Sequence, residues 1–260
     1  MSGATARAAA LTILVTGGAG YIGSHVAQRL VDDGHVVVVV DNLSNGPGSR
    51  VAATRFHQAD IGDRAFIEGL FASQRFDAVM HFAGSIQVGE SVTHPALYYR
   101  NNVAASLVLF DAMLAHGVTR LVFSSTAAIF GAPDYAPIDE AHPVRPVNPY
   151  GRSKRIVEDV LEDYRGAHGL ESTCLRYFNA AGADPQGRLG ECHEPETHLI
   201  PLVLQVASGR RQTLLLFGDE HDTPDGTCIR DYVHVTDLAE AHLLALSRLV
   251  AGARGGQYNL

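Results

Sequence analysis

A glycine-rich turn near the start of the chain does most to restrict how it can fold. The run Val-Thr-Gly-Gly-Ala-Gly-Tyr-Ile-Gly at 15–23 joins a short apolar run to a helical pattern. Gly17, Gly20 and Gly23 fit Gly-x-x-Gly-x-x-Gly, and Gly18 completes the alternative Gly-x-Gly-x-x-Gly. Such glycines permit a tight turn and let backbone N–H groups approach a pyrophosphate at a helix N-terminus. The turn therefore predicts a dinucleotide-binding unit.

Short apolar runs then alternate with helical patterns. The expected strands are 11–15, 36–40, 78–82, 120–123 and 172–177, and the expected helices are 22–33, 65–73, 97–116 and 150–167. Strict alternation predicts an α/β fold with a doubly wound parallel sheet, the Rossmann architecture. The five consecutive valines at 36–40 suit a strand that is covered on both faces.

The composition of the chain changes after residue 178. Loops rich in polar residues are expected at 180–198 and 219–226, with a helix at 199–208, strands at 213–217 and 229–235, and a helix at 236–250. We expect a disordered lead-in at 1–10, a Rossmann domain at 11–178 and a smaller substrate-binding lobe at 179–260. The helix at 236–250 is expected to pack back on the Rossmann domain. Because the chain stops in a strand-like run at 257–260, we expect this lobe to be incomplete.

Charge and cysteine content narrow the functional classes. A net charge of −8 argues against a nucleic-acid-binding surface, which is usually basic. No apolar run approaches the roughly 20 residues of a membrane helix, and we find no secretory signal. The three cysteines, Cys174, Cys192 and Cys228, are odd in number and widely spaced. This pattern is typical of reduced thiols, so we expect a cytoplasmic protein.

Asp41 ends the second expected strand, 18 residues after Gly23. A carboxylate at this place suits the adenosine ribose hydroxyls and repels a 2′-phosphate, which favours NAD over NADP.

Tyr150 and Lys154 are candidates for proton transfer. A spacing of four residues puts the phenol and the ammonium on one face of a helix. A nearby lysine favours the phenolate and is expected to lower the tyrosine pKa from about 10 toward the working range. Ser124-Ser125-Thr126 follows the expected strand at 120–123, where a hydroxyl could bind the same substrate oxygen. Helix capping by these residues is the alternative.

The chain resembles the UDP-glucose 4-epimerase family of the extended short-chain dehydrogenase/reductase superfamily. The resemblance rests on the glycine turn, on His-Phe-Ala-Gly at 81–84, Tyr-Tyr-Arg-Asn-Asn-Val at 98–103 and Phe-Ser-Ser-Thr at 123–126. It also rests on Arg-Tyr-Phe-Asn at 176–179 and Arg-Asp-Tyr-Val-His-Val at 230–235.

The resemblance implies roles for individual residues. Tyr150 would be the catalytic base and acid, Lys154 its electrostatic partner and a ligand of the nicotinamide ribose, and Thr126 the hydroxyl that shares the sugar's 4-OH. NAD would also be bound by Gly17, Gly20, Tyr21, Ile22, Gly23, Asp41, Asn42, Asn45, Asp60, Ile61, Phe82, Ala83, Gly84, Asn101 and Phe178. The UDP-sugar would be bound by Asn179, His198, Leu199, Phe217, Arg230 and Tyr232, together with Thr126 and Tyr150.

The family's reaction is the reversible 4-epimerisation of a UDP-hexose, UDP-galactose or UDP-glucose, through a 4-keto sugar. The resemblance also implies a homodimer that packs through helices at 97–116 and 150–167, where Leu107, Leu109, Phe110 and Leu114 are apolar. Sheet packing alone would also explain these side chains.

Several positions depart from the family pattern. Ile86 replaces a frequent lysine, Ala104-Ala105 replace a frequent Asn-Gly, and His198 replaces a frequent asparagine. The alternatives are a 4-epimerase of a UDP-pentose, UDP-N-acetylhexosamine or UDP-uronate, and a truncated NAD-binding protein without turnover. A 4,6-dehydratase of a dTDP-sugar would need carboxylates where this chain has Ala127-Ala128.

No metal site is expected from the sequence. Cys192, His193 and His198 match no common zinc spacing, and a polar loop that covers the substrate is the simpler interpretation.

Overall fold

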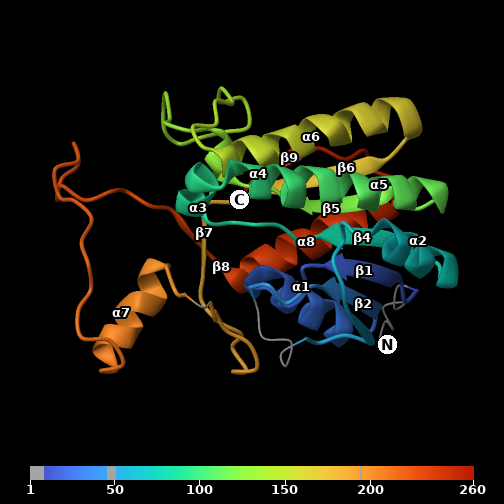
Figure 1. Ribbon diagram of the computed structural model, residues 1–260, viewed down its shortest axis with the longest axis horizontal. Coiled ribbons are helices and arrows are strands. Elements are labelled where there is room, and N and C mark those ends of the chain that lie inside the picture. The colour runs from blue at the N-terminus through green and yellow to red at the C-terminus, as the bar shows by residue number, and fades with distance from the viewer. Residues whose placement is uncertain (1–8, 46–50, 194) are drawn as a thin grey trace, which may run out of the picture.

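A seven-stranded parallel sheet forms the centre of the protein, which this computed structural model describes at residues 9–45, 51–193 and 195–260. The strand order is β3-β2-β1-β4-β5-β6-β9 (Figure 1). The strands are β1 (Thr12–Thr16), β2 (Val36–Asp41), β3 (Arg55–Gln58), β4 (Ala78–His81), β5 (Arg120–Ser124), β6 (Glu171–Arg176) and β9 (Gln257–Asn259). The predicted doubly wound Rossmann sheet is confirmed. The polar edge strand β3 was not predicted.

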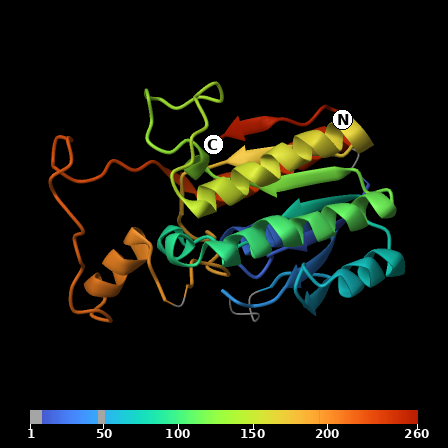
Figure 2. The same cartoon turned by 45° about the horizontal axis from the view of Figure 1, so that its top comes forward.

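Helices cover both faces of this sheet (Figures 1 and 2). One face carries α2 (Arg64–Ser73), α5 (Ala105–Ala115) and α6 (Pro149–His168), and the other carries α1 (Tyr21–Asp32) and α8 (Val235–Val250). Alternate valines of β2 enter the two cores: Val38 and Val40 join the first, and Val37 and Val39 the second. These four side chains are fully buried, as a strand covered on both faces requires.

The expected helix at 97–116 contains a π-helical turn. After α3 (Val88–Thr93) the chain forms α4 (Pro95–Tyr98), the π-helical turn η2 (Tyr99–Ala104) and α5. Asn102, which is buried in η2, donates to the Ser85 carbonyl and the Ser153 hydroxyl, both at 3.0 Å. π-Turns often occur at functional sites, and this one ties the chain after β4 to the face of α6 that carries Lys154.

The chain after residue 178 leaves the sheet and returns to it. β7 (Asn179–Ala181) pairs in parallel with β8 (Tyr232–His234), and α7 (Leu199–Ala207) extends away from the sheet with the segment that follows it (Figure 1). α8 then packs on α1, with Leu238, Leu246 and Leu249 buried in the second core. Among the described residues, no helix is both long and apolar enough to cross a membrane.

Two expectations for this region are wrong. The segment 213–217 is not a strand: it pairs with no strand among the described residues, and Phe217 is 93% exposed. A strand needs a neighbouring edge for its backbone N–H and C=O groups, and this segment has none there. The loop expected at 180–198 begins within β7 instead. The expected lead-in at 1–10 lies outside the described residues, apart from Ala9 and Ala10.

Candidate active site and dinucleotide cleft

The glycine turn presses closely on the end of β4. Gly17 has a left-handed φ of 73°, and a Cβ there would lie 2.4 Å from the Ala83 backbone nitrogen. A Cβ on Gly23 would lie 2.3 Å from the Gly17 carbonyl oxygen. Since no side chain fits in these gaps, the sequence must keep glycine there. Gly20 precedes the first turn of α1, so the helix N-terminus opens toward the sheet edge.

A cleft lies beside this turn, at the carboxyl ends of β1, β2 and β4, where the strand order reverses. Its lining includes nine residues predicted to bind NAD: Gly20, Asp41, Asn42, Asn45, Asp60, Ile61, Ala83, Gly84 and Asn101. Val40, Ser44 and Ala59 also line it and were missed, although each is next to a predicted residue in the sequence. This is where dinucleotides bind in doubly wound sheets, so the residues present fit NAD.

Asp41 is fixed at the rim of this cleft by backbone groups. Its Oδ2 accepts a hydrogen bond from the Ala19 N–H at 2.9 Å, and its Oδ1 accepts from the Leu43 N–H at 2.8 Å. A carboxylate has about four lone-pair sites, so further acceptor capacity remains for ribose hydroxyls. Across the rim, Asn42 donates to Asp60 at 3.1 Å.

Of the other predicted NAD ligands, which lie outside this lining, Ile22 packs on the second core, and Tyr21, Phe82 and Phe178 contact other parts of the chain. Tyr21 donates its hydroxyl to the Gly182 carbonyl at 2.6 Å, which ties α1 to the chain after β7. The Phe82 ring lies 4.8 Å from the His242 ring of α8. Phe178 packs on the small cluster formed by Ala127, Ile129 and Phe130.

Tyr150 and Thr126 meet at the same edge of the sheet. α6 begins there because Pro149 occupies its first turn and the Asn148 side chain accepts from the Gly151 N–H at 2.8 Å. Thr126 follows β5 and caps the short 3₁₀ turn η3 (Ala127–Ile129). Its hydroxyl also lies close enough to the Tyr150 phenol to lower the pKa of that phenol. Capping and substrate binding, posed as alternatives from the sequence, are therefore compatible roles for Thr126.

Lys154 is the only lysine among the 260 residues, and it is 3% exposed. Its Nζ donates to the Ser124 carbonyl at 2.9 Å and lies 4.8 Å from the centre of the Phe123 ring. Burial lowers the pKa of Lys154 to about 8. Burial also raises the pKa of Tyr150, although the nearby Thr126 hydroxyl opposes the increase. In this structure the net shift of the Tyr150 pKa is therefore upward and not toward the working range, as had been expected.

A buried ion pair missed by the sequence interpretation supports this edge. Glu158 lies one turn after Lys154 on α6, and Arg176 ends β6. The Arg176 guanidinium donates two hydrogen bonds to the Glu158 carboxylate, from Nε to Oε1 at 3.0 Å and from Nη2 to Oε2 at 2.6 Å. Ser125, next to Thr126, donates to the same carboxylate at 2.5 Å. Glu158, a charged residue on the inner face of α6, was the sequence signal that could have revealed this ion pair.

The predicted substrate ligands are not gathered around Tyr150. Asn179 and Tyr232 are partners in the β7–β8 ladder, and the Asn179 amide donates to the Asp231 carbonyl at 2.8 Å. The remaining residues lie farther along the chain: Leu199 is 52% exposed, Phe217 is 93% exposed, and His198 and Arg230 are also exposed. Their roles stay predictions.

Comparison with known proteins identifies the family. The model of the NAD dependent epimerase/dehydratase family matches residues 13–260. The UDP-glucose 4-epimerase of Halalkalibacterium halodurans is 50% identical over 250 residues, which are 96% of this chain and 75% of the relative. That of Azospirillum brasilense is 54% identical over 94% of this chain and 71% of the relative.

Solved structures agree with these relatives. The UDP-glucose 4-epimerase of Brucella ovis in complex with NAD has a TM-score of 0.93 at 49% identity and covers 96% of this chain and 77% of that one. The enzyme of Bifidobacterium longum in complex with NAD⁺ and UDP has a TM-score of 0.90 at 39% identity, with the same coverage. With its glycine turn, its cleft and its Tyr150–Thr126 pair, this chain belongs to the NAD dependent epimerase/dehydratase family.

Proposed function

We propose that this protein interconverts UDP-galactose and UDP-glucose by 4-epimerisation through a 4-keto sugar, using tightly bound NAD. The observation that carries the proposal is the meeting of Tyr150 and Thr126 at the sheet edge that also holds the dinucleotide cleft. The relatives at about half identity are named UDP-glucose 4-epimerases, which supports this reaction over others in the family.

In this proposal the cleft lined by Asp41, Asn42, Asp60, Gly84 and Asn101 binds NAD. When bound, NAD supplies the chemistry of accepting a hydride from the sugar carbon and returning it. Asp41 binds the adenosine ribose, and the N-terminal turn of α1 faces the phosphates. Lys154 lies beneath the catalytic edge, where it binds the nicotinamide ribose.

Tyr150 moves the proton of the sugar's 4-OH. Thr126 lies beside the phenol and holds the same sugar oxygen, so both hydroxyls converge on one atom. Burial raises the pKa of Tyr150, so a positive charge at the same edge of the sheet is needed to stabilise its phenolate. Lys154, the only lysine of the chain, supplies this charge in the proposal. After the proton leaves, the same phenol returns it to the epimeric 4-oxygen. Ala127-Ala128 offer no carboxyl group for a dehydration.

Specific residues of the chain after β6 bind the nucleotide in this proposal. Asn179 and Tyr232 lie side by side in the β7–β8 ladder, and Arg230, two residues before Tyr232, is a cation for the diphosphate. The solved complex of the Bifidobacterium longum enzyme contains UDP, which supports a uridine nucleotide as the ligand.

The proposal predicts that the purified chain converts UDP-galactose to UDP-glucose. The product is measured with a coupled dehydrogenase, and UDP-N-acetylgalactosamine, a UDP-pentose and a UDP-uronate are offered in parallel. Faster turnover of one of these would reassign the sugar. Calorimetric NAD binding without turnover of any of them would contradict the enzyme proposal and support an NAD-binding protein.

Replacing Lys154 with methionine is expected to abolish activity and raise stability. A pKa of about 8 in the folded protein against 10.5 in the unfolded chain means that burying the ammonium costs about 3 kcal/mol. That cost is fully present below pH 8 and disappears as the pH rises from about 8 to 10.5. The lost hydrogen bond to the Ser124 carbonyl offsets about 1 kcal/mol. Denaturant unfolding at pH 7 should therefore show a gain of roughly 2 kcal/mol.

The single lysine allows a direct control. Labelling with ¹⁵N-lysine gives one side-chain signal, which should titrate near pH 8 in the wild type. A midpoint near 10.5, or a K154M variant that is less stable at pH 7, would show that the ammonium is not desolvated.

We also propose a cytoplasmic homodimer. The described cysteines are all free, as in a reducing compartment, and α5 and α6 lie side by side on one face of the sheet (Figure 2). The apolar side chains predicted to form the dimer interface support it less than expected, because Leu109 and Phe110 are fully buried in the core of one subunit. Light scattering of the purified chain measures the subunit number.

A further inference from the structure

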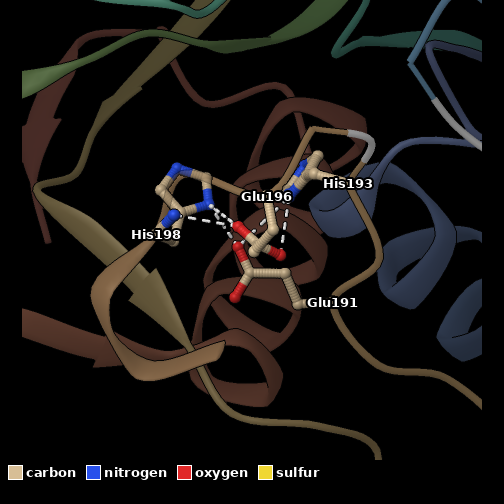
Figure 3. Close-up of side chains that lie close together, drawn as sticks. All are labelled: Glu191, His193, Glu196 and His198. Carbon is tan, nitrogen blue, oxygen red and sulfur yellow. Dashed lines mark hydrogen bonds and ion pairs between the residues drawn. The ribbon is translucent and has the colours of Figure 1, made fainter. Parts of the chain in front are cut away.

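We infer that the segment between β7 and α7 forms a binding site for one divalent transition-metal ion, with Zn²⁺ as the best-suited ion. The ligands are Glu191, His193, Glu196 and His198 (Figure 3). We expected no metal from the sequence, because Cys192, His193 and His198 match no common zinc spacing. The fold also brings the carboxylates of Glu191 and Glu196 to the two histidines, and the sequence interpretation had not included these.

The four side chains converge on one point, although they come from an irregular segment. One donor atom from each lies within 4.8 Å of those from the other three. His193 Nδ1 is 3.3 Å from Glu191 Oε1 and 3.9 Å from Glu196 Oε2. His198 Nδ1 hydrogen-bonds Glu191 and lies 3.6 Å from Glu196 Oε1. Donors about 2 Å from a central tetrahedral ion would need shifts of an ångström or so at most.

Burial and hydrogen bonding favour a cation in this position. The side chains of Glu191 and Glu196 are 8% exposed, and that of His193 is 14% exposed. Among the residues that the structure describes, His193 Nδ1 is buried without a hydrogen-bond partner, a state that is costly unless a ligand completes it. Two carboxylates with two neutral imidazoles carry a charge of −2, which one divalent cation neutralises.

The donor set selects among ions. Two imidazole nitrogens and two carboxylate oxygens suit Zn²⁺ and related first-row ions, whereas Mg²⁺ and Ca²⁺ prefer oxygen ligands alone. Four protein donors fill a tetrahedral ion completely, which is typical of a structural site. The ion would fasten the segment beside α1, because the His193 ring packs edge-on against Tyr21 with centroids 6.3 Å apart. It would also fix the start of α7, since Leu199 follows His198 directly.

The test uses the full chain, treated with a chelator and titrated with Zn²⁺ by calorimetry and with Co²⁺ by visible absorption. The expected result is one equivalent of each ion, with the spectrum of tetrahedral Co²⁺ and no charge-transfer band from thiolate sulfur. E191Q and H193A should each weaken Zn²⁺ binding by at least about 10- to 100-fold, since even outer-shell changes have effects of this size. Zn²⁺ should raise the thermal midpoint of the wild type by more than that of E191Q or H193A.

Two control variants separate this site from other ligands. C192S/C228S removes both exposed thiols, one of them inside the segment, and H221A removes an exposed histidine outside the cluster. Both should bind Zn²⁺ as the wild type does. The proposal is overturned if the wild type binds no Zn²⁺, if C192S/C228S loses binding, or if the pair E196Q/H198A retains it while circular dichroism shows a folded chain. Binding is read without turnover, so the result is independent of the proposed epimerase activity.

Discussion

Replacing Tyr150 with phenylalanine is expected to lower kcat for UDP-galactose about 10³-fold, within the range that general acid–base groups contribute. In the proposed mechanism the phenol exchanges the proton while Thr126 holds the same sugar oxygen. Phenylalanine keeps the ring, which lies 6.4 Å from that of Tyr98, so packing should change little. KM and the affinity for NAD should therefore stay within a few-fold of the wild type, as measured by steady-state kinetics and calorimetry.

Tyr164→Phe is the matched control, because it removes a phenol from the same helix at a distant place. The Tyr164 hydroxyl bonds Asp111 at 3.0 Å and plays no part in the site. This variant should keep nearly full activity. If Tyr150→Phe retained more than a tenth of the wild-type kcat, another group would have to be the base, and the proposed roles of Tyr150 and Thr126 would be wrong.

The central sheet could be predicted from sequence because its signals are local. Buried parallel strands such as β2 read as apolar runs, and the glycine turn marks the junction of β1 and α1. Most residues that line the cleft could also be predicted, because parallel strands bring their carboxyl ends to one edge of the sheet. The π-turn at Tyr99–Ala104 could not be predicted, because the sequence stays helical and the turn is tied to distant parts of the chain, such as Ser85 and Ser153.

The chain beyond β6 was less predictable for a related reason. Leu214, Leu215 and Leu216 have the apolar character of a strand, but strand formation depends on a neighbouring edge that local sequence does not encode. The cluster of Glu191 and Glu196 with two histidines likewise depends on how an irregular segment folds back. A hydrophobic pattern can mark Glu158 as a charged residue on the inner face of α6, but it does not identify Arg176 as its partner.

Replacing Arg176 with methionine is expected to destabilise the protein by about 3–5 kcal/mol, because it leaves the buried Glu158 carboxylate with only the more exposed Arg155, at 3.6 Å, as a described ion-pair partner. Both side chains are at most 5% exposed, and the fork between them joins α6 to β6. The double variant E158Q/R176M removes both charges and should recover at least half of the loss. Urea unfolding at pH 7 measures these differences.

The surface variant R145M provides the comparison. Arg145 pairs with Asp134 at 3.1 Å, but the two side chains are 69% and 46% exposed, so its loss should change stability by less than about 1 kcal/mol. If R176M behaved like R145M, the buried pair would not be a fixed contact. The double variant also tests function, because Glu158 accepts from Ser125, which is next to Thr126. A folded E158Q/R176M with a lowered kcat and an unchanged affinity for NAD would show that the ion pair positions Thr126 against Tyr150, in addition to holding the helix on the sheet.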